Sequence, residues 1–259
     1  MSTSADDLNA CAGLVQRGDA DRFLAAMAAP VPARRVLFPL YAMNVEVSRA
    51  PWVTQEAMIA EMRLQWWRDA LEEIAKGGPV RRHDVVTPLA AALTPEQAEA
   101  LDEYIAARRW DIYRDPFEDE ADFDRYLDRT SGSLMWAAAR ALGPAEEAVV
   151  RDFAYAAGVA NWLRAVPELA ARGRIPLIDG SPAGLRALAQ RGLDRLGRAR
   201  RRRGAVSPAA RPALLAGWQA GAILRQVIAD PARVGAAALG QSEARRRLTL
   251  MARAASGRW

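Results

Sequence analysis

The chain has 259 residues and a formal net charge of +5, and alanine, leucine and arginine dominate its composition. This length is enough for one large domain with a sizeable core. The single cysteine, Cys11, excludes an internal disulfide framework and a cysteine-based metal cluster, and it favours a reducing compartment. Because β-branched residues are sparse and strand-like alternation is hard to find, the composition predicts an all-helical protein.

The sequence does not predict a membrane-spanning protein. No apolar run reaches the roughly 20 residues that cross a bilayer. The stretch from Met1 to Asp7 is acidic and lacks the apolar segment of a signal peptide. We therefore expect a cytoplasmic protein, and any contact with the inner face of the cytoplasmic membrane is expected to be peripheral.

The first third of the chain predicts three helical regions. One or two short helices are expected over residues 5–28, with Asp19 or Asp21 as an N-cap. An apolar stripe with spacings of three and four follows over residues 33–49, and a long amphipathic helix is expected over residues 54–76. The core face of this long helix is predicted to contain Met58, Met62, Gln65, Trp66 and Asp69.

Further helices are predicted along the rest of the chain. Thr94 and Pro95 form a helix N-terminal signature. Another helix is expected over residues 121–142, one starts at Ala145, and Ser-Pro pairs begin the later ones. Because no internal repeat and no long linker divides the chain, we expect residues 1–259 to form a single helical domain of about ten helices.

Three features that could carry chemistry have simpler interpretations. His83, the only histidine, lies in a predicted loop without a nucleophile nearby in the sequence and is expected on the surface. The acidic residues from Asp111 to Asp128 are spaced irregularly around a proline, so a solvated loop is favoured over a metal site. The arginines from Arg186 to Arg203 could meet an anionic membrane or a diphosphate, but a solvated helix end is favoured and nucleic acid is not expected as a partner.

Three segments, taken in order, carry a resemblance to a known family. Residues 30–44 contain a Pro, an Arg pair and Leu-Tyr-Ala-Met-Asn; residues 62–71 read Met-Arg-Leu-Gln-Trp-Trp-Arg-Asp-Ala-Leu; residues 161–174 contain Asn-Trp-Leu-Arg and Arg-Gly-Arg. Together they resemble the squalene/phytoene synthase family of head-to-head prenyltransferases. This resemblance implies an all-α, single-domain isoprenoid synthase bundle around a central cavity.

The chemistry implied by the resemblance needs carboxylates that this chain lacks. Family members hold magnesium ions with two aspartate-rich motifs on facing helices, and the ions neutralise the diphosphate as it leaves. The acid positions of the family correspond here to Ser48, Arg49, Trp52, Ala165 and Leu169, and the family glutamine corresponds to Gly158. We therefore expect no catalytic residues, no metal site and no cofactor.

One branch of the family departs in the same way. Its mitochondrial members assist the assembly of respiratory complex I, and they resemble this chain in Asn44-Val45-Glu46, in the helix from Met62 to Trp67, and in Leu163-Arg164-Ala165 followed by Pro167. The resemblance implies a non-catalytic bacterial relative whose partners are complex I subunits or assembly intermediates. A lipid or isoprenoid ligand in the cavity is left open.

Twelve side chains are candidates to line the cavity or to meet a diphosphate. They are Arg34, Tyr41, Asn44, Glu46, Gln65, Trp66, Arg68, Trp136, Asn161, Arg164, Arg172 and Arg174. The alternative function is an active prenyltransferase acting on isoprenyl diphosphates. In that case the arginines among these residues, with Arg35, would hold the diphosphate through guanidinium forks, and Mg²⁺ would be the expected cofactor.

Overall fold

The computed structural model describes residues 5–54, 56–113 and 115–259, and within them the regular structure is helical apart from one isolated antiparallel bridge between Ala145 and Val206. The helices are α1 (Ala5–Gly18), α2 (Ala20–Ala28), α3 (Val31–Arg49), α4 (Ala57–Ala75), α5 (Val86–Ala92), α6 (Pro95–Ala100), α7 (Asp102–Ala107), α8 (Glu120–Leu127), α9 (Ser133–Leu142), α10 (Glu147–Ala171), α11 (Pro182–Arg201), α12 (Arg211–Leu214), α13 (Ala220–Ala229), α14 (Ala232–Gly235) and α15 (Glu243–Ser256). The predicted all-helical fold class is confirmed.

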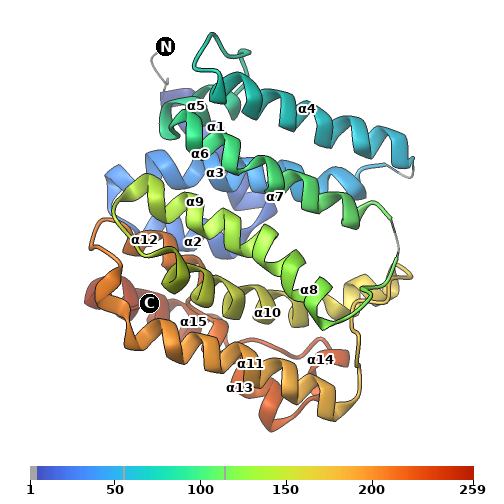
Figure 1. Cartoon of the computed structure of the whole chain (residues 1–259). Coiled ribbons are helices and arrows are strands. Elements are labelled where there is room, and N and C mark those ends of the chain that lie inside the picture. The colour runs from blue at the N-terminus through green and yellow to red at the C-terminus, as the bar shows by residue number, and fades with distance from the viewer. Residues whose placement is uncertain (1–4, 55, 114) are drawn as a thin grey trace.

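The helices α3 and α10 form the middle of the bundle. Figure 1 shows α4 along one edge and α11 with α13 along the opposite edge. Helix α3 packs against α1, α2, α5 and α9, while α10 packs against α9, α11 and α13. One cluster of buried apolar side chains includes residues from Cys11 in α1 to Trp259 beyond α15. No helix in the described part of the chain is both long and apolar enough to cross a membrane.

Local sequence signals explain where several helices begin. The Asp19 carboxylate accepts a hydrogen bond of 2.9 Å from the Arg22 amide, so Asp19 rather than Asp21 caps α2. Thr94 and Gln97 form a reciprocal capping box at the start of α6, as the Thr-Pro signature predicts. Ser181 caps α11 through the amide of Gly184 at 3.1 Å.

The predicted core face of α4 is wrong. Met58 and Met62 are 74% and 65% exposed, and Gln65 and Asp69 are exposed as well. The buried side chains of α4 are Ala60, Leu64, Trp67, Ala70, Leu71 and Ile74. Apart from the indole N–H of Trp67, this stripe carries no side-chain donor or acceptor that would lose water on burial.

The helix predicted over residues 121–142 contains a local change of winding. Residues Asp128–Gly132 form a π-helical turn between α8 and α9, and Thr130 Oγ1 donates to the Tyr126 carbonyl at 2.7 Å within it. The turn brings Ser131 against Gly158 of α10, where a β-carbon would lie 2.8 Å from Ser131 Oγ. Gly158 therefore lets the two segments approach more closely than any side chain would allow.

We predict that Gly158→Gln lowers the free energy of unfolding by about 1–3 kcal/mol, because the added side chain collides with Ser131 in a packed interior. Urea denaturation followed by circular dichroism measures the change. Gly197→Gln is the matched control, since a β-carbon at this α11 position would meet only the flexible end of Arg201 at 3.4 Å. Equal losses of stability in the two variants would contradict the close approach at Gly158.

Candidate functional site

The positions that the resemblance assigns to the first acid motif form a main-chain hydrogen bond and an aromatic contact. Ser48 Oγ donates to the Val45 carbonyl within α3 at 3.2 Å. Trp52 lies in the 3₁₀ turn Ala50–Trp52. The guanidinium carbons of Arg172 and Arg174 lie 4.4 Å and 4.8 Å from the centre of its ring. The side chain at this acid position therefore attracts cations through its π face and has no oxygen to offer a metal.

The positions that the resemblance assigns to the second acid motif pack against the core. Ala165 packs partly buried against the core, and Leu169 is 9% exposed. Glu168 points into solvent and pairs with Arg172 at 2.6 Å. Among residues 5–54, 56–113 and 115–259, no three His, Cys, Asp or Glu side chains lie close enough together to hold a metal ion.

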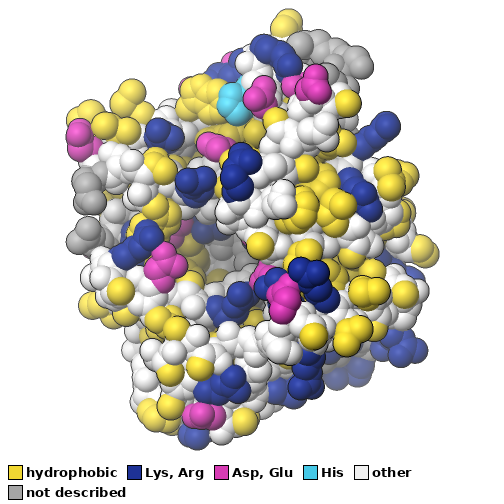
Figure 2. Space-filling model, turned by 180° about the vertical axis from the view of Figure 1, so that it is seen from behind, with side chains coloured by type: hydrophobic (Ala, Val, Ile, Leu, Met, Phe, Trp, Pro, Cys, Tyr) yellow, Lys and Arg dark blue, Asp and Glu magenta, His cyan; other side chains and the backbone are white. Residues whose placement is uncertain are grey.

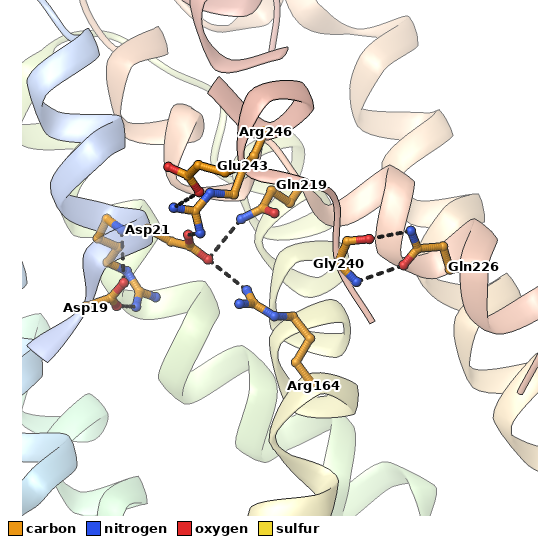
Figure 3. Close-up of polar contacts among 9 residues, drawn as sticks. Asp19, Asp21, Arg164, Gln219, Gln226, Gly240, Glu243 and Arg246 are labelled. Atoms are coloured by element: carbon orange, nitrogen blue, oxygen red, sulfur yellow. Dashed lines mark hydrogen bonds and ion pairs between the residues drawn. The ribbon is translucent and has the colours of Figure 1, made fainter. Parts of the chain in front are cut away.

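A carboxylate from α2 binds the arginine next to the second motif. Asp21 accepts hydrogen bonds from Arg164 Nη1 at 2.7 Å, Gln219 Nε2 at 2.9 Å and Arg246 Nη1 at 3.2 Å (Figure 3). Arg246 also pairs with Glu243 on its own helix at 2.9 Å. We call Asp21, Arg164, Gln219 and Arg246 the Asp21 network. It joins α2, α10, the start of α13 and α15.

The Asp21 network was not predicted. Asp21 was considered only as an N-cap, and its donors lie 143, 198 and 225 residues further along the chain. No periodicity or local spacing relates residues so far apart. Of the four residues, only Arg164 was a candidate, through the family resemblance.

Tyr41 and Asn161 lie on the same pocket, which Arg22 helps to bound. Arg22 donates to the Asp19 carboxylate, and its guanidinium carbon lies 5.7 Å from the centre of the Tyr41 ring. Burial alone would lower the pKa of Arg22. Asp19 and the neighbouring tyrosines raise it by more, so the pKa of Arg22 lies above its ordinary value. The volume of this pocket is about 10 Å³, which is room for about one water molecule. This volume is too small for an isoprenoid chain.

One face of the molecule is hollowed. Figure 2 shows a hollow near its middle, with Lys or Arg and Asp or Glu side chains gathered around it. A separate pocket, of about 460 Å³, is lined by Trp52, Glu56, Arg172 and Arg174 among others.

Three candidates on α4 lie away from Tyr41 and Asn161. Gln65 and Arg68 line an open groove of about 600 Å³ between α4 and α6–α7, and Arg68 pairs with Asp102 at 2.7 Å. Trp66 packs against His83 with ring centres 5.1 Å apart. His83 is half-buried, and its Nδ1 accepts a hydrogen bond from the Val85 amide at 3.1 Å, so the expected surface histidine has a structural contact.

The remaining candidates have internal partners or pack against the core. Arg34 Nη2 donates to the Met27 carbonyl at 2.8 Å at the end of α2. Buried Asn44 accepts from Tyr104 Oη at 2.8 Å. Glu46 is half-buried, and Trp136 packs half-buried against the core.

The segment that carries Asp111 is not the solvated loop that was predicted. Asp111 is 6% exposed, and its carboxylate accepts from Tyr126 Oη at 2.8 Å and from Arg108 at 3.2 Å. Burial, followed by the charge of Asp111, raises the pKa of Tyr126 well above its ordinary value. Arg174, 7% exposed, donates to the main-chain carbonyls of Tyr113, at 2.9 Å, and Asp111. This candidate arginine therefore fastens the exit of α10 to the segment after α7.

The sequence is similar to a known protein family and to individual proteins. A family model described as squalene/phytoene synthase matches residues 15–177. The chain is 28% identical over 177 residues to a Drosophila melanogaster homolog of NADH dehydrogenase (ubiquinone) complex I, assembly factor 6, and 24% identical over 180 residues to the Homo sapiens protein of that name. These alignments cover 65% and 64% of this chain, and 53% and 51% of the relatives, so the chain spans about half the length of the curated relatives it matches.

Solved structures share the fold. A dehydrosqualene synthase crystallised with a ligand superimposes with a TM-score of 0.74 at 16% identity, covering 96% of this chain and 95% of that one. A squalene synthase from Alicyclobacillus acidocaldarius superimposes with a TM-score of 0.71 at 18% identity, covering 85% of this chain and 92% of that one. At these identities the likeness concerns the fold alone.

We predict that Asp21→Asn destabilises the protein by roughly 1–2 kcal/mol, because it leaves Arg164 and Arg246 without their shared carboxylate. The loss of stability is smaller than for a fully buried ion pair, since the Arg164 side chain is 35% exposed. Urea denaturation measures it. Glu243→Gln is the control, because it removes a partner of Arg246 that lies on the same helix. If Asp21→Asn costs no more than Glu243→Gln, the network does not hold the four segments together.

Proposed function

The chain belongs to the squalene/phytoene synthase family, and we propose that it is a non-catalytic member that assists the assembly or maturation of respiratory complex I. The observation that carries the proposal is that the positions assigned by the family resemblance to the two carboxylate motifs hold Ser48, Arg49, Trp52, Ala165 and Leu169, none of which is an acid. Magnesium prefers carboxylate and water oxygens in near-octahedral geometry. Without such ligands, ionisation of an allylic diphosphate loses several kcal/mol of electrostatic stabilisation.

The arginines retained from the family do not offer an obvious substitute for the metal. Arg164 pairs with Asp21, Arg172 with Glu168, and Arg68 with Asp102. Each guanidinium would have to give up a carboxylate before it bound a diphosphate, so part of the binding free energy would be lost in breaking the existing pair. This supports the non-catalytic proposal over the alternative of a metal-independent prenyltransferase.

The similarity to complex I assembly factor 6 supports the choice of partner. It is distant, at 24–28% identity, and covers about half of those proteins. We propose complex I subunits or assembly intermediates as partners, met in the cytoplasm or at the inner face of the membrane.

A prenyltransferase assay tests the chemistry. Purified protein incubated with farnesyl or geranylgeranyl diphosphate and Mg²⁺ should release no more pyrophosphate than a blank, because no paired carboxylates stabilise the leaving group. A catalytically active squalene synthase under identical conditions is the positive control. Release of pyrophosphate together with formation of a coupled hydrocarbon would overturn the non-catalytic assignment.

A genetic experiment tests the partner. Deleting the gene in its native host should lower the amount of assembled complex I and the NADH dehydrogenase activity of membranes, and the gene supplied in trans should restore both. A Glu46→Gln, Glu168→Gln double variant should restore them equally well, because neither remaining acid near the motifs is assigned a catalytic role. Normal complex I in the deletion strain would refute the assembly role whatever the outcome of the enzyme assay.

A further inference from the structure

Four arginines gather at the end of the molecule formed by α11, α13 and α15, away from the family motifs. We call Arg200, Arg203, Arg225 and Arg253 the arginine cluster. None of the four forms an ion pair with a carboxylate in the described part of the chain. Figure 2 shows dark blue side chains gathered along the lower right edge of its face, in the region of these helices.

Two arginines next to the cluster in the sequence do form ion pairs. Arg198 pairs with Asp152 at 3.0 Å, and Arg202 beyond the helix end pairs with Glu146 at 2.7 Å. The arginine run that was predicted as a solvated helix end therefore divides into two sets. Arg198 and Arg202 are neutralised by carboxylates of α10 and its N-cap, whereas Arg200 and Arg203 belong to the arginine cluster.

The cluster lies beside Gly221 in α13. A β-carbon at Gly221 would lie 3.1 Å from Leu196 Cδ2, 3.4 Å from Arg225 Nη1 and 3.7 Å from Arg200 Nη1. Two guanidiniums therefore approach the same point, which Leu196 also contacts. Arg200 Nε donates to the main-chain oxygen of Trp259 at 3.2 Å, while its Nη2 is buried and has no hydrogen-bond partner.

The electrostatics of the cluster are unbalanced. Burial, followed by the charges of Arg253, Arg225 and Arg203, lowers the pKa of Arg200 to about 10. Burial and Arg225 also lower the pKa of Arg253. Buried donors without acceptors and adjacent like charges both cost free energy, and an oxyanion bound by these guanidiniums would relieve both.

Part of the cluster is accessible from solvent, because Arg203 and Arg225 are exposed. Arg225 also lines a groove of about 500 Å³ whose other charged lining residues are Arg233, Arg245 and Asp230. On the adjacent α15, Leu248 and Met251 are 66% and 64% exposed. An anion could therefore enter either free or attached to a lipid whose acyl region meets this apolar face.

We propose that the arginine cluster over Gly221 is a binding site for a phosphate-class oxyanion, either free or as the headgroup of an anionic lipid. Guanidinium forks match the oxygens of phosphate, and three helices supply them without a competing carboxylate. The proposal does not depend on the assembly role, because it concerns different residues and a different ligand.

Thermal unfolding in phosphate and in pyrophosphate, each at ionic strength matched with sodium chloride, tests the site. The melting temperature should rise with either anion relative to chloride. The Arg225→Gln, Arg253→Gln double variant should bind about tenfold more weakly and melt no lower than the unsubstituted protein without phosphate, because it removes like-charge repulsion. Arg201→Gln, an exposed change on α11, is the control and should retain the anion response.

The Gly221→Ala variant distinguishes binding at this site from nonspecific attraction of anions to the positive charge of the protein. It keeps all four arginines and places a methyl group at the point of convergence, so it should weaken phosphate binding at unchanged net charge. This variant also keeps the test decisive if the double variant fails to fold.

Flotation with phosphatidylglycerol-containing vesicles, compared with phosphatidylcholine alone, distinguishes the two sources. Phosphate-dependent stabilisation without flotation indicates a free oxyanion, and flotation lost in Gly221→Ala indicates a lipid headgroup. If neither phosphate nor vesicles distinguishes the unsubstituted protein from Gly221→Ala, the proposal is wrong. That is the result expected if the main-chain oxygen of Trp259 already saturates the cluster.

Discussion

The contact between Asp21 and its three donors is the polar interaction on which the arrangement of the bundle depends most. Asp21 lies in the first turn of α2, and its carboxylate is shared by α10, α13 and α15. The carboxylate is only 20% exposed, so its charge acts in a medium less polarisable than water. Four segments that are distant in the sequence are thus tied together by one shared carboxylate.

The same principle extends to the other arginines that the chain shares with the family. Arg172 faces Glu168 and the Trp52 ring, and Arg174 donates to main-chain carbonyls. Each guanidinium has found a partner inside the protein. The arginine cluster over Gly221 stands apart from this pattern, because its charges converge without a carboxylate and their cost is not offset within the described residues.

Much of the fold could be predicted because its signals are local. Thr94 and Pro95 mark a helix start by spacing alone. The face of α4 was misjudged because Met58, Met62 and Trp66 form a second, partly apolar stripe on that helix. Only tertiary packing selects the stripe with Leu64, Trp67 and Leu71. Asp111 and the Asp21 network could not be found, since their partners are brought together by the folded chain and no local pattern relates them.

The close approach of Ser131 to Gly158 limits which substitutions the chain can accept singly. A change at position 165, which is only partly buried, would leave the path of α10 unaltered. A larger residue at position 158 would not, because the π-helical turn would have to withdraw in the same step. Substitution at position 158 is therefore tied by packing to the segment that carries Ser131.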